Sequence, residues 1–177
     1  MRSNIILIGM PGAGKSTVGV VLAKLLGYDF VDLDLVIMRR HGQTLQQMLD
    51  RHGVEQFLEW ESQAAQSLEC QRTVIATGGS VVLSRHAMEH LRAMGLVVYL
   101  DVPLPELEKR ITDLATRGIV FEEGQTLADI YRQRLPLYRR WADRVLPFDA
   151  CDGGIGALAQ SAAEKYLLWE QSRPPIS

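Results

Sequence analysis

The sequence predicts an α/β fold in which parallel strands alternate with crossover helices within one domain, 1–177. Short apolar runs recur along the chain and are separated by longer amphipathic stretches, and this alternation favours a parallel sheet. The first apolar run breaks into a glycine-rich turn that leads into a helical stretch, which indicates a strand–loop–helix unit. A chain of 177 residues that is 47% hydrophobic and 23% charged fits a single compact domain with a substantial core.

Five apolar runs are the candidate strands. They are Asn4–Gly9, Asp29–Asp34, Thr73–Gly79, Leu96–Asp101 and Arg144–Asp149. After the first, Thr17–Leu26 predicts a helix that Gly27 ends. The stretch from Leu35 to Leu68 holds two or three helical pieces punctuated by Gly42 and Gly53, so it is much longer than a simple crossover. Insertions of this kind usually carry a site.

The second half of the chain predicts two further helices, Glu106–Ala115 and Gln125–Ala142. Pro136 lies within the later one and either kinks it or ends it. Between the two helices, Thr116–Thr126 contains two glycines, mixed charge and no clear period. This composition is typical of a mobile loop near an active face, and equally of plain surface.

Composition and charge exclude several classes of protein. The formal net charge of −2 argues against non-specific nucleic-acid binding and favours a small-molecule partner. Cys70 and Cys151 lie far apart without CxxC spacing, so neither a disulfide framework nor a zinc site is indicated, and a reducing cytoplasm fits. No apolar run approaches the roughly 20 residues that span a bilayer, so we expect no membrane contact.

The most specific motif is Gly9–Ser16, which matches G-x-x-x-x-G-K-[ST] between an apolar strand and a helix. Glycines let the backbone wrap a phosphate, and successive N–H groups at a helix N-terminus attract its oxygens. Lys15 is expected to reach the β- and γ-phosphates and Ser16 to bind magnesium. The predicted nucleotide-contacting residues of this motif are Gly12, Ala13, Gly14, Lys15, Ser16 and Thr17.

Asp32 and Asp34 lie two residues apart at the end of the second predicted strand. In an extended segment both would point the same way, toward the carboxyl ends of the strands, where open α/β sheets bind ligands. One carboxylate then serves the metal and the other holds or deprotonates an acceptor hydroxyl. The alternative is that Asp34 only caps the following helix.

The turn Thr77–Ser80 follows the third strand and opens onto the same face. Its paired glycines favour a substrate-contacting turn, although an ordinary strand-to-helix turn capped by Ser80 or Ser84 is the alternative. Arg117 and Arg134 are weaker candidates, because arginines in loops and helices are usually solvated surface charges.

These motifs together resemble the shikimate kinase family from about Asn4 to Ala150. "GMPGAGKSTVG" is similar to its nucleotide loop, "FVDLDLVI" to its F-x-D-x-D-x-x-I segment, "IATGGSVVL" to its glycine turn, and "QRLPLYRRWAD" to its R-x-x-L-Y-x-x-x-A-D helix. The resemblance implies a P-loop three-layer sandwich with a five-stranded parallel sheet, like that of nucleoside monophosphate kinases. It also implies an acceptor-binding insertion at about 35–69, a lid loop at about 112–125, and a monomer.

On the nucleotide side, the resemblance implies that ATP is the phosphate donor. Lys15 would stabilise the transferring phosphoryl group, and Arg117 would close over ATP. Ser16 and, through water, Asp32 would hold Mg²⁺.

On the acceptor side, the resemblance implies that Asp34 binds the hydroxyl of shikimate and takes its proton. Gly78 and Gly79 would line the pocket, and Arg134 would bind the carboxylate. Phe57 matches the phenylalanine of the family's G-E-x-x-F-R-x-x-E segment, which reads "GVEQFLEWE" here.

Three departures from the family pattern concern the acceptor and the lid. Leu58 stands where the family has a second carboxylate-binding arginine, Ser80 replaces the third glycine of the turn, and Gly118 replaces the proline after Arg117. A leucine facing the acceptor favours an acceptor molecule with an apolar edge there, and Ser80 adds a hydroxyl that can form a hydrogen bond.

The alternatives to a shikimate kinase are therefore a related P-loop kinase with another small hydroxylated acceptor, or an ATP-binding regulatory protein without turnover. Nucleoside monophosphate and gluconate kinases match "QRLPLYRRWAD" less well.

Overall fold

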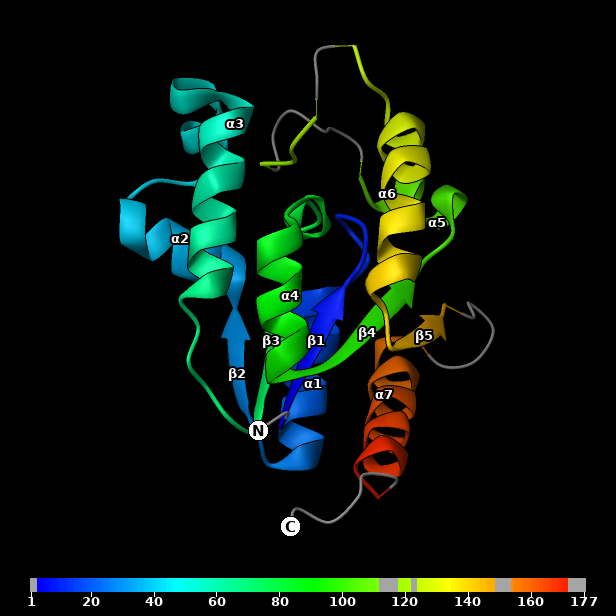
Figure 1. Cartoon of the computed structure of the whole chain (residues 1–177). Helices are drawn as coiled ribbons and strands as arrows, with labels where there is room; N and C mark the ends of the chain where they lie inside the picture. Colours follow the sequence, from blue (N-terminus) through cyan, green and yellow to red (C-terminus); the bar gives the residue numbers. More distant parts are fainter. Residues whose placement is uncertain (1–2, 112–117, 122–123, 149–153, 172–177) are drawn as a thin grey trace.

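The computed structural model describes residues 3–111, 118–121, 124–148 and 154–171 (Figure 1). The strands in these ranges are β1 (Asn4–Ile8), β2 (Asp29–Asp32), β3 (Thr73–Ala76), β4 (Gly95–Asp101) and β5 (Arg144–Pro147). The helices are α1 (Lys15–Leu26), α2 (Leu33–His41), α3 (Leu45–Gln66), α4 (Arg85–Met94), α5 (Leu104–Arg110), α6 (Leu127–Trp141) and α7 (Gly154–Gln171), with a short 3₁₀ helix, η1 (Val81–Leu83).

The five strands form one parallel sheet in the order β2-β3-β1-β4-β5, which confirms the predicted sheet. The central strand is β1, where Ile6 pairs with Ile75 on one side and Val97 on the other. Residues Ile5 to Ile8 are fully buried, as expected for a strand covered on both faces. Because the strands are parallel, their carboxyl ends meet at one edge, where the phosphate loop and the glycine turn begin.

Helices cover both faces of the sheet and complete the three layers. On one face α1 packs against α7 and against β2 and β3, while on the other α4 packs against β1 and β4, and α6 against β4. Figure 1 shows α4 in front of the sheet and α1 behind it. In the predicted insertion, α2 packs against α3, and α3 is kinked at Gly53 (φ 78°, ψ 174°).

The structure corrects the prediction that Asp32 and Asp34 share an extended segment. Strand β2 ends at Asp32, and Asp34 lies in the first turn of α2. Asp32 Oδ1 accepts hydrogen bonds from the backbone N–H groups of Asp34 (3.0 Å) and Leu35 (3.4 Å). Asp32 is thus the helix cap, because its carboxylate satisfies amides that a helix start leaves unpaired, and Asp34 is free to face elsewhere.

Helix α5 differs from its predicted extent, and α6 shows the effect of Pro136. The helix predicted at Glu106–Ala115 begins at Leu104 and ends at Arg110, since Ile111 leaves helical geometry, and 112–115 lie outside the described residues. Helix α6 continues through Pro136, which lies on its exposed face. In the part of the chain that the structure describes, no helix has the length and apolar character needed to cross a bilayer.

Candidate active site

The carboxyl ends of β1, β2 and β3 open onto a cavity of about 300 Å³. Its walls come from the phosphate loop, the first turn of α2, the middle of α3, the glycine turn, residues 118–120 and α6. The predicted site residues that the cavity brings together are Gly12, Gly14, Lys15, Ser16, Thr17, Asp34, Phe57, Gly78, Gly79, Ser80 and Arg134. Segments that lie far apart in the sequence therefore line the same cavity.

The phosphate loop has the geometry that its glycines predict. Gly14 adopts a left-handed conformation (φ 90°, ψ 19°) immediately before α1, so the loop delivers Lys15 at the helix N-terminus. Lys15 is 8% exposed, and its Nζ donates to the carbonyls of Gly9 (2.8 Å) and Met10 (2.9 Å). Burial lowers the pKa of Lys15 to about 8. The side chain remains mainly protonated at neutral pH and suits an anionic ligand.

Ala13, which the motif predicts to contact the nucleotide, lies beside the residues that line the cavity. It is 1% exposed, and its backbone N–H donates to the Met10 carbonyl at 3.1 Å. This backbone N–H therefore stabilises the turn itself.

Ser16 and Asp32 lie side by side at the start of α1 and α2. Ser16 Oγ donates to Asp32 Oδ2 at 2.6 Å, so two hard oxygen atoms are adjacent, and of the two residues Ser16 lines the cavity. Within the described ranges, no cluster of three or more His, Cys, Asp or Glu side chains could enclose a metal. Two oxygens next to a phosphate loop fit Mg²⁺, which keeps several waters and is usually held by few protein ligands together with substrate phosphates.

Asp34 faces the cavity beside Lys15. Burial raises the pKa of Asp34 to about 6, Lys15 opposes this rise, and Asp32 adds to it. The carboxylate is mostly ionised at pH 7, yet more basic than a solvated aspartate. These are the properties of a group that takes a proton from a bound hydroxyl.

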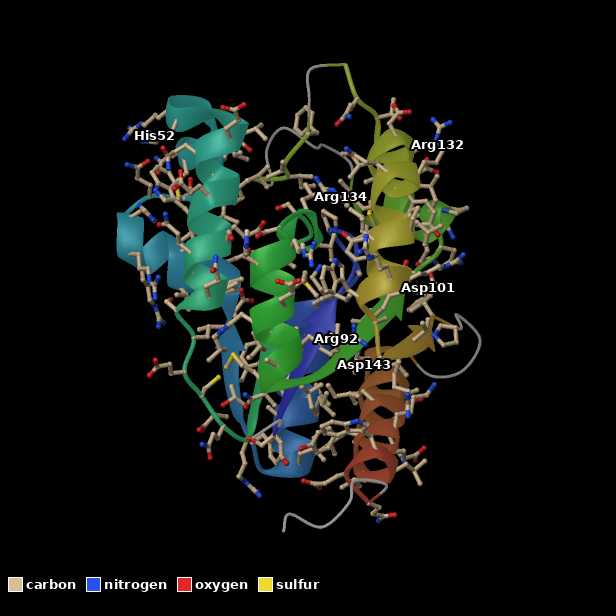
Figure 2. All side chains as sticks on the ribbon, viewed as in Figure 1. His52, Arg92, Asp101, Arg132, Arg134 and Asp143 are labelled. Atoms are coloured by element: carbon tan, nitrogen blue, oxygen red, sulfur yellow. The ribbon has the colours of Figure 1, made fainter. Side chains whose placement is uncertain are left out.

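Arg134 lies within the cavity wall rather than on the surface. It is 2% exposed, and its Nη2 donates to the Val120 carbonyl at 2.5 Å. Its Nε has no hydrogen-bond partner among the described residues. Figure 2 shows Arg134 on the side of α6 that faces the interior and Arg132 on the opposite side. A buried guanidinium with an unused donor is suited to a carboxylate ligand.

Glu61 is a cavity residue that the sequence reasoning missed. It is 2% exposed, lines the cavity from α3, and accepts a hydrogen bond from Ser80 Oγ at 2.7 Å. Burial raises the pKa of Glu61 to about 7. A pattern in the sequence does mark it, because Phe57, Glu61, Ala64 and Ala65 fall on one helical face that is otherwise apolar.

Tyr138 is a second residue missed from sequence. It lies one helical turn after Arg134, donates from its hydroxyl to the Gly79 carbonyl at 2.6 Å, and stacks on Tyr99 with the ring centroids 5.1 Å apart. These contacts tie α6 to the glycine turn.

Leu58, which is predicted to face the acceptor, does not line the main cavity. Phe57 lines the main cavity, but the next residue on a helix points about 100° away, and Leu58 lines a neighbouring cavity of about 460 Å³. Glu61 and Ser80 border both cavities. Leu58 is therefore separated from the main cavity by this pair.

Of the predicted lid loop, the structure describes 118–121 and 124–125, whereas Arg117 lies outside the described residues. Gly118 lines the cavity and its N–H donates to Gln46 Oε1 at 3.0 Å. Together with the bond from Arg134 to Val120, this contact links the segment to both α3 and α6.

The buried Glu61 predicts a pH-dependent stability. Its pKa rises from 4.5 to about 7 on folding, so between these values the folded state keeps a proton that the unfolded chain has lost. The free energy of unfolding therefore falls as pH rises through this window, by about 3 kcal/mol from this one group. We expect Glu61→Gln to be more stable than wild type at pH 8, with little difference at pH 4.5, in urea unfolding at both pH values.

Glu59→Gln, at an exposed neighbouring position, is the control. Equal stability of Glu61→Gln and wild type at both pH values would contradict the assignment.

Comparison with known proteins places this site in a family. The family model described as shikimate kinase matches residues 11–152. A shikimate kinase of Pasteurella multocida is 39% identical over 84% of this chain and 87% of its own length, and one of Methylococcus capsulatus is 40% identical over 82% and 83%. The solved shikimate kinase of Acinetobacter baumannii in complex with shikimate has a TM-score of 0.87 and 32% identity, and the match covers 98% of this chain and 97% of that one. The chain belongs to the shikimate kinase family, whose members are ATP-dependent small-molecule kinases.

Proposed function

We propose that this chain transfers the γ-phosphoryl group of ATP to a hydroxyl of shikimate. The observation that carries the proposal is the convergence of Lys15, Asp34 and Arg134 on one cavity. Lys15 belongs to the phosphate loop, Asp34 is the available base, and Arg134 offers an unpaired donor to a carboxylate. The likeness to a solved relative that is bound to shikimate supports this acceptor.

The nucleotide half of the site comprises the phosphate loop and the residues next to it. Gly12, Ala13, Gly14, Lys15 and Thr17 would surround the phosphates. Ser16 and, through water, Asp32 would hold Mg²⁺, which neutralises phosphate charge when it is bound. Arg117 is proposed to close over ATP as part of the lid loop at about 112–125.

The acceptor half lies between α2, α3 and α6. Asp34 binds the reacting hydroxyl and takes its proton, and Arg134 binds the carboxylate. Phe57 and the turn at Gly78, Gly79 and Ser80 line the space between them. We propose that the single domain thus carries its acceptor-binding insertion at about 35–69.

The test is coupled ADP release with ATP–Mg²⁺ and shikimate, run beside a panel of small hydroxy acids, amino alcohols and sugars. We expect wild type to turn over shikimate with a low KM. Leu58→Arg restores the arginine of the family pattern, and Leu25→Arg, at an exposed position of α1, controls for the added charge.

Each outcome separates two interpretations. Wild-type turnover of shikimate means that Arg134 and its surroundings bind the carboxylate without the second arginine. Two results would overturn shikimate as the acceptor. One is that wild type turns over another compound but not shikimate, and the other is that turnover of shikimate appears only in Leu58→Arg. ATP binding without turnover of any compound would favour the regulatory alternative.

A further inference from the structure

The bond between Ser80 and Glu61 forms a buried polar wall at the acceptor end of the cavity. Ser80 is 4% exposed and Glu61 2% exposed, and Ser80 Oγ donates to Glu61 Oε2 at 2.7 Å. Burying a carboxylate is costly unless its oxygens find donors. Ser80 satisfies one of the two oxygens.

The second oxygen, Glu61 Oε1, is buried and has no hydrogen-bond partner among the described residues. Its position follows from Gly78. A Cβ placed on Gly78 would lie 3.0 Å from Asp34 Oδ1 and still nearer to Glu61 Oε1. Asp34 Oδ1 and Glu61 Oε1 therefore both lie within 3.0 Å of the position that a Cβ of residue 78 would occupy. Any side chain larger than that of glycine would collide with them.

The groups that face Glu61 come from every neighbouring element. Asp34 on α2 raises its pKa, whereas Lys15 in the phosphate loop and Arg134 on α6 lower it, and the pKa of the facing Tyr138 is raised in part by Glu61 itself. The hydrogen bond from Ser80 also lowers the pKa of Glu61, against the larger effect of burial. Ser80 thus favours the ionised, hydrogen-bond-accepting form of this carboxylate.

We propose that Ser80 is a positioning residue that holds Glu61 so that Oε1 accepts a hydrogen bond from a second hydroxyl of the acceptor. Since Asp34 Oδ1 and Glu61 Oε1 lie beside the same backbone position, they suit two hydroxyls on adjacent carbons. The site then selects a vicinal diol whose reacting hydroxyl lies at Asp34 and whose neighbouring hydroxyl lies at Glu61. This inference rests on the proposed kinase function and adds a positioning residue to its acceptor site.

The experiment compares wild type, Ser80→Ala, Ser80→Thr and the control Ser67→Ala, which lies at the exposed end of α3. Steady-state kinetics are measured from pH 5.5 to 8.5 with shikimate and with an analogue that lacks the neighbouring hydroxyl. Loss of a hydrogen bond to a charged group predicts that Ser80→Ala raises the acceptor KM about tenfold. The KM for ATP should stay unchanged, and Ser80→Thr, which keeps the hydroxyl, should restore the acceptor KM.

Two further readouts separate positioning from a structural role. The acidic inflection of kcat/KM for shikimate should move to higher pH in Ser80→Ala, because Glu61 loses a donor that stabilises its charge. With the deoxy analogue, Ser80→Ala should cause no additional loss. An unchanged KM and pH profile in Ser80→Ala, or an equal loss with both compounds, would overturn the proposal.

Failure of the proposed function gives a different result. If wild type does not turn over shikimate, calorimetric binding of the panel's vicinal diols and their deoxy counterparts decides the question for Ser80. A preference of wild type for the diols that Ser80→Ala lacks would support the proposal. Equal binding of diols and deoxy compounds, or binding of neither, would overturn it.

Discussion

Replacing Asp34 with asparagine should lower kcat by about 10²- to 10⁴-fold and leave ATP binding nearly intact. Asparagine keeps the size of the side chain, but it cannot take the proton of the acceptor hydroxyl. Asp34 does not cap α2, because Asp32 does so, and the helix is therefore expected to survive the change. The loss should fall on the chemical step.

The measurement combines single-turnover ADP release with calorimetric titration of ATP–Mg²⁺. Asp50→Asn is the matched control, since Asp50 lies on the exposed face of α3 and accepts a hydrogen bond from Gln46 on the same helix. Near-normal turnover in Asp34→Asn would remove Asp34 from the chemistry. Lost ATP binding would show that Asp34 holds the nucleotide rather than the acceptor.

Replacing Arg134 with methionine should raise the KM for shikimate by roughly 30-fold to several thousand-fold. This range corresponds to the 2–5 kcal/mol lost when one partner of a desolvated charge pair is removed. Among the described residues that line the cavity, Lys15 and Arg134 are the cations, and Lys15 belongs to the phosphate end. No other described cation of the cavity is therefore placed to bind the carboxylate in its stead.

The control for this change is Arg132→Met on the same helix. Arg132 projects away from the cavity and pairs with Asp129 at the surface (Figure 2). A shikimate analogue with its carboxylate reduced to an alcohol completes the test. Wild type should bind this analogue as weakly as Arg134→Met binds shikimate, and the variant should show no further loss. An equal penalty with both compounds would mean that Arg134 acts on the fold, through Val120, rather than on the acceptor.

The parts of the molecule that local pattern determines were predictable from sequence. The buried strands read as apolar runs because both of their faces are covered, and the phosphate loop reads as a motif because its backbone geometry requires glycines. Arg134 was different. The position of Arg134 on α6 could not distinguish a buried guanidinium from a solvated one. The expectation that it binds the carboxylate came from the family resemblance, and its burial is consistent with that role.

The features that sequence did not reveal depend on side chains from distant segments. Asp32, rather than Asp34, caps α2, because the strand stops two residues earlier than its predicted end. Glu61 was overlooked because a glutamate on a helix is usually solvated, and its burial depends on Ser80 meeting it from another element. Leu58 was placed facing the acceptor, although helix rotation turns it into the neighbouring cavity.

The place of β1 at the centre of the sheet has a consequence for how the chain is made. This strand leaves the ribosome before both of its neighbours: Thr73, which bonds to Asn4, follows 69 residues later, and β4 comes later still. At about 5–20 residues per second, this buried apolar strand therefore waits on the order of several seconds for its first neighbour. During that time its unpaired edges are open to aggregation, and the cavity at its carboxyl end cannot yet form.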